Sequence, residues 1–302
     1  MDLDLGQLRA LSAAVSEGTL EAAARALHVT PSAISQRLRA LEVATGRVLL
    51  VRSKPVRVTG SGEVLLRLAR QVELLTGDTL AELDADGAGG PAGRGVQTLP
   101  IAVNADSLAT WVLPALAPLA GPVCFEIHRD DEGHTASLLR AGTVVAAVTT
   151  DADPVSGCSV TRLGVMRYRP VVAADRAREW FPDGPTARAL ARAPVVVFDR
   201  KDDLQHRYLR GRLPGTEGTA QPPVHHVPSS ADFLTAVRLG LGWGMLPDLQ
   251  SHPDEVAGSL VDVDPAGAID VVLHWQQWKL RSASLDRVAA AVTAAARRHL
   301  VQ

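Results

Sequence analysis

The sequence predicts an α/β protein in two parts: an N-terminal winged helix-turn-helix continued by a long helix, and a larger α/β domain. Three observations support this fold class. Residues 21–42 have the pattern of helix, turn and helix, the chain around them carries an excess of positive charge, and from residue 98 short apolar runs alternate with helical segments. At 302 residues, 46% of them hydrophobic, the chain can form about two domains.

The stretch EAAARALHVTPSAISQRLRALE, residues 21–42, predicts the helix-turn-helix. Thr30 is suited to cap the second helix through its side-chain oxygen, and Pro31 fits the first helical position, where no amide donor is needed. The apolar positions that follow are spaced by four and three residues and predict one buried stripe: Ile34, Leu38 and Leu41. A first helix over residues 5–17 is expected to precede this pair and to end at Gly18.

Short polar and basic side chains lie between the apolar positions of this second helix and point outward. Such side chains suit the DNA major groove, because Arg pairs with guanine, Gln with adenine, and Ser reaches phosphate. The predicted partner is therefore double-stranded DNA. The candidate DNA-binding residues on this helix are Thr30, Ser32, Ser35, Gln36, Arg37 and Arg39.

A short β-ribbon is predicted after the helix, with strands at 48–51 and 56–58 and a turn at 53–55. From residue 28 to residue 58 the chain has six Arg or Lys and one acidic residue, which is typical of a phosphate-binding surface. A helical hairpin from some other core would explain the apolar stripe but not this charge. The candidate DNA-binding residues of the ribbon, or wing, are Arg52, Lys54 and Arg57.

Apolar positions repeat along residues 61–86 and predict one long helix. A helix of roughly 25 residues spans about 37 Å and has no core of its own. We expect its apolar stripe to pack against a second copy of the chain, the alternative being a helix that folds against its own domain. Residues 87–97 are rich in glycine and predict a hinge after this helix. The residues before the helix, 1–60, are predicted to form the DNA-binding domain.

The remaining chain, residues 98–302, alternates predicted strands with helices, which indicates a mostly parallel α/β sheet. A second set of such elements starts near residue 168. The clearest predicted strands are 99–105, 123–128, 144–150 and 269–278, and an alanine-rich helix is predicted at 283–300.

Residues 5–62 resemble the DNA-binding module of LysR-type transcriptional regulators. The matching pieces are QLRALSAAVSEGTLEAAARALHVTPSAISQRLRALE, the glycine of ATG, then LLVRS and VRVTGSGE. The Ser-Gln-Arg order at 35–37 is similar to the arginine/lysine-responsive, ArgP/LysG-like branch of that family.

The α/β part resembles the effector-binding domain of the same family, which has a two-lobed, periplasmic-binding-protein-like fold. This resemblance implies a lobe I over 98–165 and 269–302 and a lobe II over 166–268. It also implies a dimerising linker helix over 61–86 and a homo-oligomer, either dimer or tetramer. The small-molecule effector would be lysine or arginine, and the controlled genes would serve amino-acid export or biosynthesis.

Ligands of open α/β sheets bind beyond the carboxyl ends of strands, near helix N-termini. That rule selects 104–107, 128–135, 149–153, and 198–203 together with 229–232. Several of these segments hold aspartates, whose carboxylates suit an ammonium or guanidinium group, while hydroxyls and backbone amides suit a carboxylate. The candidate effector-binding residues are Asn104, Asp106, Ser107, Asp130, Thr149, Asp199 and Ser230.

Enzyme, metal and membrane functions are not expected. The chain lacks G-x-S-x-G, P-loop and G-x-G-x-x-G motifs, and GLGWG at 240–244 follows a helix instead of opening one. His128 and His134, with the two aspartates between them, are too loosely spaced for a metal site, so no cofactor is expected. An acidic N-terminus, two cysteines and no run of eighteen apolar residues favour the cytoplasm.

The sequence thus predicts a sequence-specific DNA-binding transcriptional regulator of the LysR type. Two alternatives keep only half of the observations. A nucleoid- or replication-associated DNA-binding protein without an effector would use the N-terminal module, and a solute-binding protein would use the α/β domain. The second is disfavoured because no signal peptide is recognised and the N-terminal module is basic.

Overall fold

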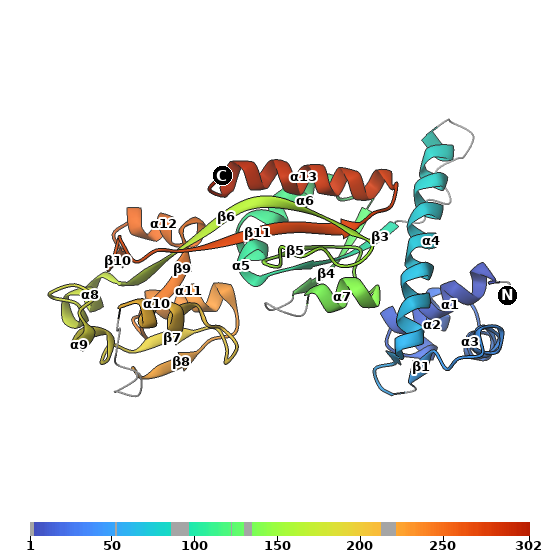
Figure 1. Cartoon of the computed structure of the whole chain (residues 1–302), viewed down its shortest axis with the longest axis horizontal. Coiled ribbons are helices and arrows are strands. Elements are labelled where there is room, and N and C mark those ends of the chain that lie inside the picture. The colour runs from blue at the N-terminus through green and yellow to red at the C-terminus, as the bar shows by residue number, and fades with distance from the viewer. Residues whose placement is uncertain (1–2, 52, 86–96, 122, 130–134, 213–221) are drawn as a thin grey trace. The chain divides into compact units, whose positions relative to one another are not determined.

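The computed structural model describes residues 3–51, 53–85, 97–121, 123–129, 135–212 and 222–302. Figure 1 shows their helices and strands along the chain. The chain divides into two compact units. The first unit comprises residues 1–103, 117–161 and 275–290, and the second comprises 104–116, 162–274 and 291–302. Three elements run through residues of both units: β6 (Cys158–Ala173), β11 (Ile269–Trp278) and α13 (Ala283–His299).

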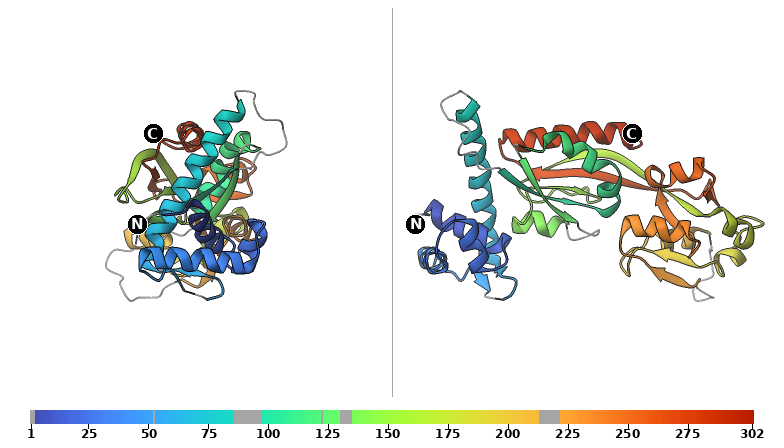
Figure 2. Two further views of the ribbon diagram at one scale, coloured as in Figure 1. Left: turned by 90° about the vertical axis from the view of Figure 1, so that its right-hand side faces the viewer. Right: turned by 180° about the vertical axis from the view of Figure 1, so that it is seen from behind.

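The N-terminal module of the first unit is the predicted winged helix-turn-helix. Its helices and strands are α1 (Leu5–Ser16), α2 (Leu20–Ala26), α3 (Pro31–Thr45), β1 (Leu50–Val51) and β2 (Arg57–Val58). They lie at the N-terminal end of the long helix α4 (Gly60–Ala85), as Figure 2 shows from two further sides. The caps are local: Thr30 Oγ1 accepts a hydrogen bond from the Ala33 amide at 3.2 Å, and Gly46 ends α3 with a left-handed φ of 62°.

The core of this module is the predicted stripe of α3 together with α1. Ile34, Leu38 and Leu41 are buried against Leu8 and Leu11. Because these side chains occupy the inner side of α3, the polar residues between them remain on its outer side.

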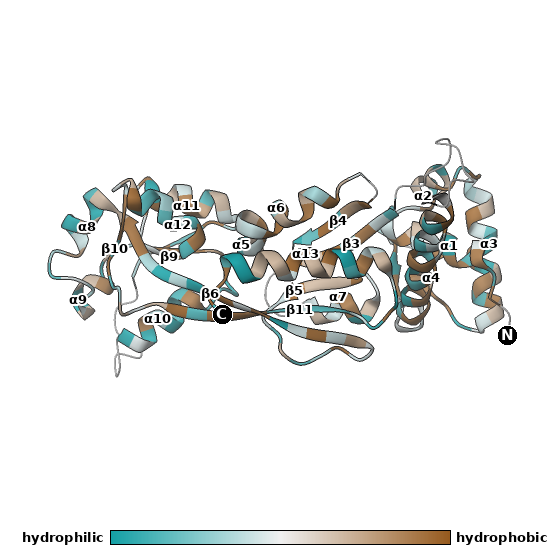
Figure 3. Cartoon of the chain, turned by 90° about the horizontal axis from the view of Figure 1, so that it is seen from above, coloured by the Kyte–Doolittle hydropathy of each residue, from teal (hydrophilic) through white to brown (hydrophobic). Residues whose placement is uncertain are grey.

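Helix α4 has apolar residues on more than one side, and Figure 3 shows apolar and polar positions interspersed around it. Leu66, Ala69 and Leu74 are buried within the first unit. A second set is exposed in the single chain: Val64, Leu75, Leu80 and Leu83. The helix therefore both packs against its own module and keeps apolar side chains uncovered.

Helix α4 also contacts the turn that follows α7 (Thr135–Ala141). The guanidinium of Arg70, which is buried, donates hydrogen bonds to the Thr143 carbonyl and to Ser16 Oγ, both at 2.9 Å. Gly142 makes the approach possible: its φ is +74°, and a Cβ there would lie 2.7 Å from the backbone of Arg67. The Arg70 hydrogen bond thus holds this turn against the helix, and the missing side chain of Gly142 leaves room for the close approach.

The first unit contains three parallel strands, β3 (Gln97–Val103), β4 (Val123–Arg129) and β5 (Ala146–Thr149). They belong to a seven-stranded sheet in which β5 is also hydrogen-bonded to β11. β3 is the central one, with Ile101 opposite Ile127 of β4 and opposite Ala146 of β5. These pairings agree with the expectation of parallel strands. The carboxyl end of β3, at Val103, leads directly into residues 104–107.

Two strands of the second unit are exceptions to the mostly parallel arrangement that the sequence predicts. β9 (Gly244–Pro247) and β10 (Leu260–Asp262) both run antiparallel to β6, and Val171 pairs with Gly244 on one side and Asp262 on the other. β9, α12 (Asp248–Val256) and β10 make a crossover, and β6 is inserted between its two strands in the opposite direction. Alternation along the chain indicates a crossover but not which strand is inserted into it.

The other elements of the second unit include β7 (Val195–Val197) and β8 (Val224–His226), a parallel pair. Its core joins Val171, Val196 and Leu246 to Phe233 and Val237. The helical segments not yet named are α5 (Ala105–Ser107), the π-helix η1 (Leu108–Val112), α6 (Leu113–Leu116), the 3-10 helix η2 (Ala117–Leu119, in the first unit), α8 (Ala174–Trp180), α9 (Ala187–Leu190), α10 (Leu204–Arg212) and α11 (Ser230–Arg238).

Among the helices of the described residues, none is both long enough and apolar enough to span a bilayer.

Candidate DNA-binding surface and effector site

The outer side of α3 carries the predicted groove-reading side chains. Ser32, Gln36 and Arg39 are exposed, and Ser35 and Arg37 are partly buried. The Arg37 guanidinium lies beside Gly6 of α1. Thr30 accepts its capping hydrogen bond and shares a second with Ser32 Oγ at 2.9 Å, so its hydroxyl holds the first turn in place. The surface therefore offers hydroxyl, amide and guanidinium groups from one helix.

The wing keeps two of its predicted cations at the surface. Lys54 and Arg57 are exposed, and Arg52 lies outside the described residues. The strands pair with Leu50 opposite Val58, and Thr59 Oγ1 donates to the Val48 carbonyl at 2.7 Å. These contacts close the ribbon, while its long cationic side chains remain available to phosphates.

A hydrogen-bonded carboxylate lies in the second unit, at the segment after β3. Asp106, in α5, accepts a hydrogen bond from Ser230 Oγ at 2.7 Å on one oxygen and from Tyr168 Oη at 2.8 Å on the other. Asn104 is the N-cap residue of α5, and Ser230 is the first residue of α11. Two of the predicted effector residues, Asp106 and Ser230, are thus brought into contact although 124 positions separate them.

The electrostatics of this carboxylate are unusual for an aspartate. Burial raises the pKa of Asp106, the two hydroxyl donors lower it, and the negative charge of Asp202 raises it further. No Lys or Arg in the described residues makes an ion pair with Asp106. A carboxylate with hydroxyl donors, a like charge nearby and no cation is suited to a cationic ligand.

Two other polar atoms of the same segment are buried without a hydrogen-bond partner among the described residues. They are the hydroxyl of Ser107, which is 0% exposed, and the side-chain oxygen of Asn104. Buried polar atoms are normally paired, because an unpaired one keeps its full desolvation penalty. The Ser107 hydroxyl can donate to a ligand carboxylate, and the Asn104 oxygen can accept from an ammonium group.

The remaining predicted effector residues make local contacts. Asp199 Oδ1 accepts hydrogen bonds from the amides of Lys201 and Asp202, in its own loop. Thr149, in the first unit, accepts from the Asp151 amide at 3.1 Å. The segment 130–134, which includes Asp130, lies outside the described residues.

Sequence reasoning missed two residues of the candidate site. Tyr168 was assigned only to a strand, and Gln250 falls in a helix that was not predicted. Asp202 lies in the selected segment 198–203, although Asp199 was preferred there. Gln250 Nε2 donates to the Ser230 carbonyl at 3.0 Å and lies 3.2 Å from Ser230 Oγ. A tyrosine at the start of a predicted strand was a weak signal, because its hydroxyl required a polar partner once buried.

A winged helix-turn-helix with an outward basic surface, joined to an α/β domain with a ligand-ready carboxylate, defines a class of DNA-binding regulators. Two family models match the chain. Residues 5–63 match the bacterial regulatory helix-turn-helix protein model, lysR family, and residues 92–297 match the LysR substrate binding domain. The chain belongs to the LysR family of bacterial transcriptional regulators.

Individual relatives agree over almost the whole chain. It is 44% identical to the lysine export transcriptional regulatory protein LysG of Corynebacterium efficiens, over 94% of each chain. It is 38% identical to the transcriptional regulator ArgP of Escherichia coli, over 96% of this chain and 95% of that one.

Solved structures of similar proteins have the same fold. ArgP from Mycobacterium tuberculosis superposes with a TM-score of 0.83 at 42% identity, covering 99% of both chains. Full-length LysG from Corynebacterium glutamicum with bound effector Arg gives a TM-score of 0.76 at 40% identity, covering 99% of this chain and 100% of that one.

Proposed function

We propose that this regulator binds a basic amino acid, lysine or arginine, at Asp106, and that binding alters how it contacts the promoters of amino-acid export or biosynthesis genes. The observation that carries the proposal is the Asp106 carboxylate, which has two hydroxyl donors and, within the part of the chain that the structure describes, no ion pair with a cation. An ammonium or guanidinium group supplies the missing positive charge.

A free amino acid also brings a carboxylate and an α-ammonium group. The buried Ser107 hydroxyl is the donor proposed for the ligand carboxylate, and the Asn104 side-chain oxygen is the acceptor proposed for an ammonium group. Ser230 and Tyr168 hold Asp106 in place and then share it with the ligand. Asp130, Thr149 and Asp199 stay predictions of further contacts.

Two relatives support this choice of ligand. The LysG protein of Corynebacterium glutamicum has a structure with bound effector Arg, and the Corynebacterium efficiens relative is named for lysine export. The acidic character of the site in this chain fits both of these basic amino acids and disfavours acidic ones, which Asp106 and Asp202 would repel.

The DNA-bound form is proposed to be a homodimer or a tetramer. The exposed apolar residues of α4 support pairing of this helix with that of a second copy, which would remove them from water. Two copies of α3 would then enter successive major grooves about 34 Å apart. The proposal assigns the protein no catalytic reaction and places it in the cytoplasm, with the chromosomal DNA.

An electrophoretic mobility assay tests the proposal with the full chain and the DNA upstream of its neighbouring gene. Lysine or arginine is expected to change the mobility or the affinity of the complex, and glutamate is the matched negative control. Calorimetric titration with each of the twenty amino acids measures the ligand separately. DNA binding with no saturable heat from any amino acid would instead favour an architectural DNA-binding protein.

A further inference from the structure

We propose that Arg169 is a positioning residue of the effector site and acts through helix α12. The inference deepens the proposed function, on which it rests, because it names a residue that sets the geometry of that site without touching it. Arg169 is on β6 and forms no hydrogen bond or ion pair with Asp106, Ser107 or Ser230 in the described structure.

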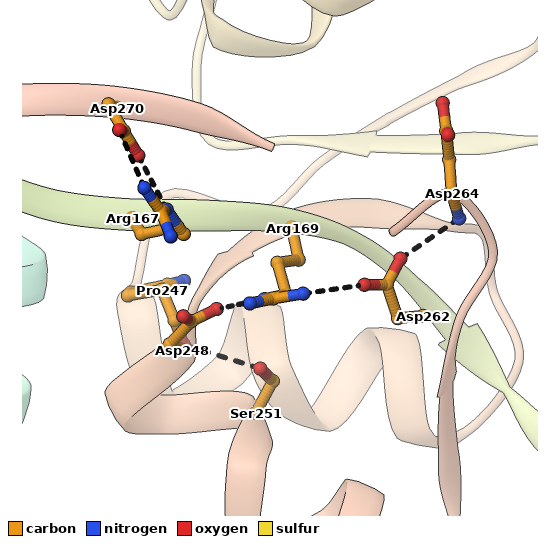
Figure 4. A network of polar contacts seen from close by, with 8 residues as sticks. All are labelled: Arg167, Arg169, Pro247, Asp248, Ser251, Asp262, Asp264 and Asp270. Atoms are coloured by element: carbon orange, nitrogen blue, oxygen red, sulfur yellow. Dashed lines mark hydrogen bonds and ion pairs between the residues drawn. The ribbon is translucent and has the colours of Figure 1, made fainter. Parts of the chain in front are cut away.

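The guanidinium of Arg169 joins three elements of the second unit (Figure 4). Its Nε donates to Asp248 Oδ1 at 2.7 Å, and its Nη1 donates to Asp262 Oδ2 at 3.2 Å. Asp248 is the first residue of α12, and Asp262 is the last residue of β10. One side chain on β6 therefore fixes the start of α12 relative to the sheet.

From α12 a chain of hydrogen bonds reaches the site. Gln250, two residues after Asp248, donates through Nε2 to the Ser230 carbonyl at 3.0 Å. The hydroxyl of Ser230 then donates to Asp106 at 2.7 Å. A shift at the start of α12 moves the Gln250 amide, and with it the hydroxyl that orients the Asp106 carboxylate.

Strand β6 thus controls both hydroxyl donors of Asp106. Tyr168 donates directly, and the adjacent Arg169 acts from the other side of the strand because successive side chains point to opposite sides. Loss of Arg169 removes the ion pair at the start of α12, whereas Arg238 still pairs with Asp254 of that helix and Tyr168 stays in place on β6. The expected consequence is weaker binding of the effector by a folded protein.

Arg167 provides a matched control on the same strand. It lies two residues earlier, on the same side as Arg169, and its Nε and Nη2 donate to Asp270 of β11 at 2.8 and 2.9 Å. The two arginines are similarly exposed, at 35% and 30% of their side chains. Of these two arginines, Arg169 alone makes its ion pair with α12, so the comparison separates loss of a surface ion pair from loss of α12 positioning.

The test is calorimetric titration of the full chain with lysine and with arginine. Arg169→Gln is expected to raise the Kd about fivefold, and Arg167→Gln to leave it within about twofold. In a Gln250→Ala background, Arg169→Gln is expected to add less than about twofold, because both changes release the same contact. Equal effects of the two arginine variants, or independent effects of Arg169→Gln and Gln250→Ala, would overturn the inference.

Amide hydrogen exchange on the effector-free protein measures the same positioning without a ligand. Arg169→Gln is expected to speed exchange in α12 and in residues 230–233, and Arg167→Gln is not. If Arg169→Gln does not fold, Asp248→Asn breaks the same contact from the side of α12. Wild-type protein that binds neither lysine nor arginine would refute the proposed ligand alone, whereas unchanged exchange in the variants would refute the positioning role.

Discussion

Replacing Asp106 by Asn tests the central charge of the effector site with the smallest change of shape. The amide keeps one oxygen that accepts a hydrogen bond, so Ser230 or Tyr168 retains its partner, but the negative charge is removed. The other hydroxyl meets an NH₂ group and must turn to accept from it. We expect the variant to fold and to bind DNA, and to lose affinity for lysine and arginine.

The size of this loss follows from the surroundings of the carboxylate. Removing one member of a desolvated, hydrogen-bonded charge pair costs about 2–5 kcal/mol of binding free energy. Asp106 is only partly buried in the chain without ligand, so the lower part of that range applies. At about 1.4 kcal/mol for each factor of ten, we expect a Kd roughly 30- to 300-fold higher.

The raised pKa of Asp106 adds a dependence on pH with a definite sign. Effector affinity falls as the pH is lowered through this raised pKa, because the protonated carboxyl no longer carries the charge. The stability of the protein without ligand changes in the other direction: a raised pKa in the folded state stabilises it at low pH, and this contribution is lost as the pH rises through the folded-state pKa. Asp106→Asn removes both dependences.

Calorimetry between pH 4 and pH 8, with urea denaturation at the same pH values, measures both effects. Asp270→Asn is the control, because Asp270 forms an exposed ion pair with Arg167 in the same unit and lies outside the candidate ligand segments. The reasoning is refuted if Asp106→Asn binds lysine and arginine as tightly as wild type, or if the Asp270 control loses as much affinity.

Three further predictions concern the N-terminal module and α4. Gly142→Ala brings a Cβ within 2.7 Å of the α4 backbone and should lower the free energy of unfolding in urea by more than about 1 kcal/mol. The loss should exceed that of Gly157→Ala, where a Cβ has open space, and equal losses would contradict the prediction. Gln36→Ala should weaken binding to the preferred DNA site more than to bulk DNA, because a base contact carries specificity. Lys54→Ala should weaken both alike and lower the slope of log affinity against log salt concentration by about one, because a phosphate contact is lost. Identical behaviour of the two variants would contradict these roles. Leu80→Glu, at a position 55% exposed, should reduce the mass seen by sedimentation, and an unchanged mass would exclude α4 pairing at that residue.

The N-terminal module could be predicted almost residue by residue because its signals are local. A cap such as Thr30 bonds an amide three residues away, Gly46 ends the helix it follows, and the stripe of α3 is set by helical spacing. The candidate DNA contacts followed from the same spacing, since a residue between two buried positions points outward.

The effector site could be predicted only in part. Asp106, Ser107 and Ser230 could be selected as candidates because each follows a strand or begins a helix, which is a local property. Gln250 and Arg169 could not, because α12 has few apolar residues and the contacts of both residues join segments that are distant in the chain.

The sequence alone determined the helix-turn-helix, the outward side of its second helix and the aspartates of the candidate ligand segments, because caps, spacing and strand ends act within one or two helical turns. Its resemblance to the LysR-type regulators indicated the rest of the architecture. Tertiary structure alone decided that β9 and β10 run against β6 and that Tyr168 and Ser230 meet on one carboxylate. Those contacts join residues more than 60 positions apart, and no local preference of the chain specifies which distant hydroxyl will reach Asp106.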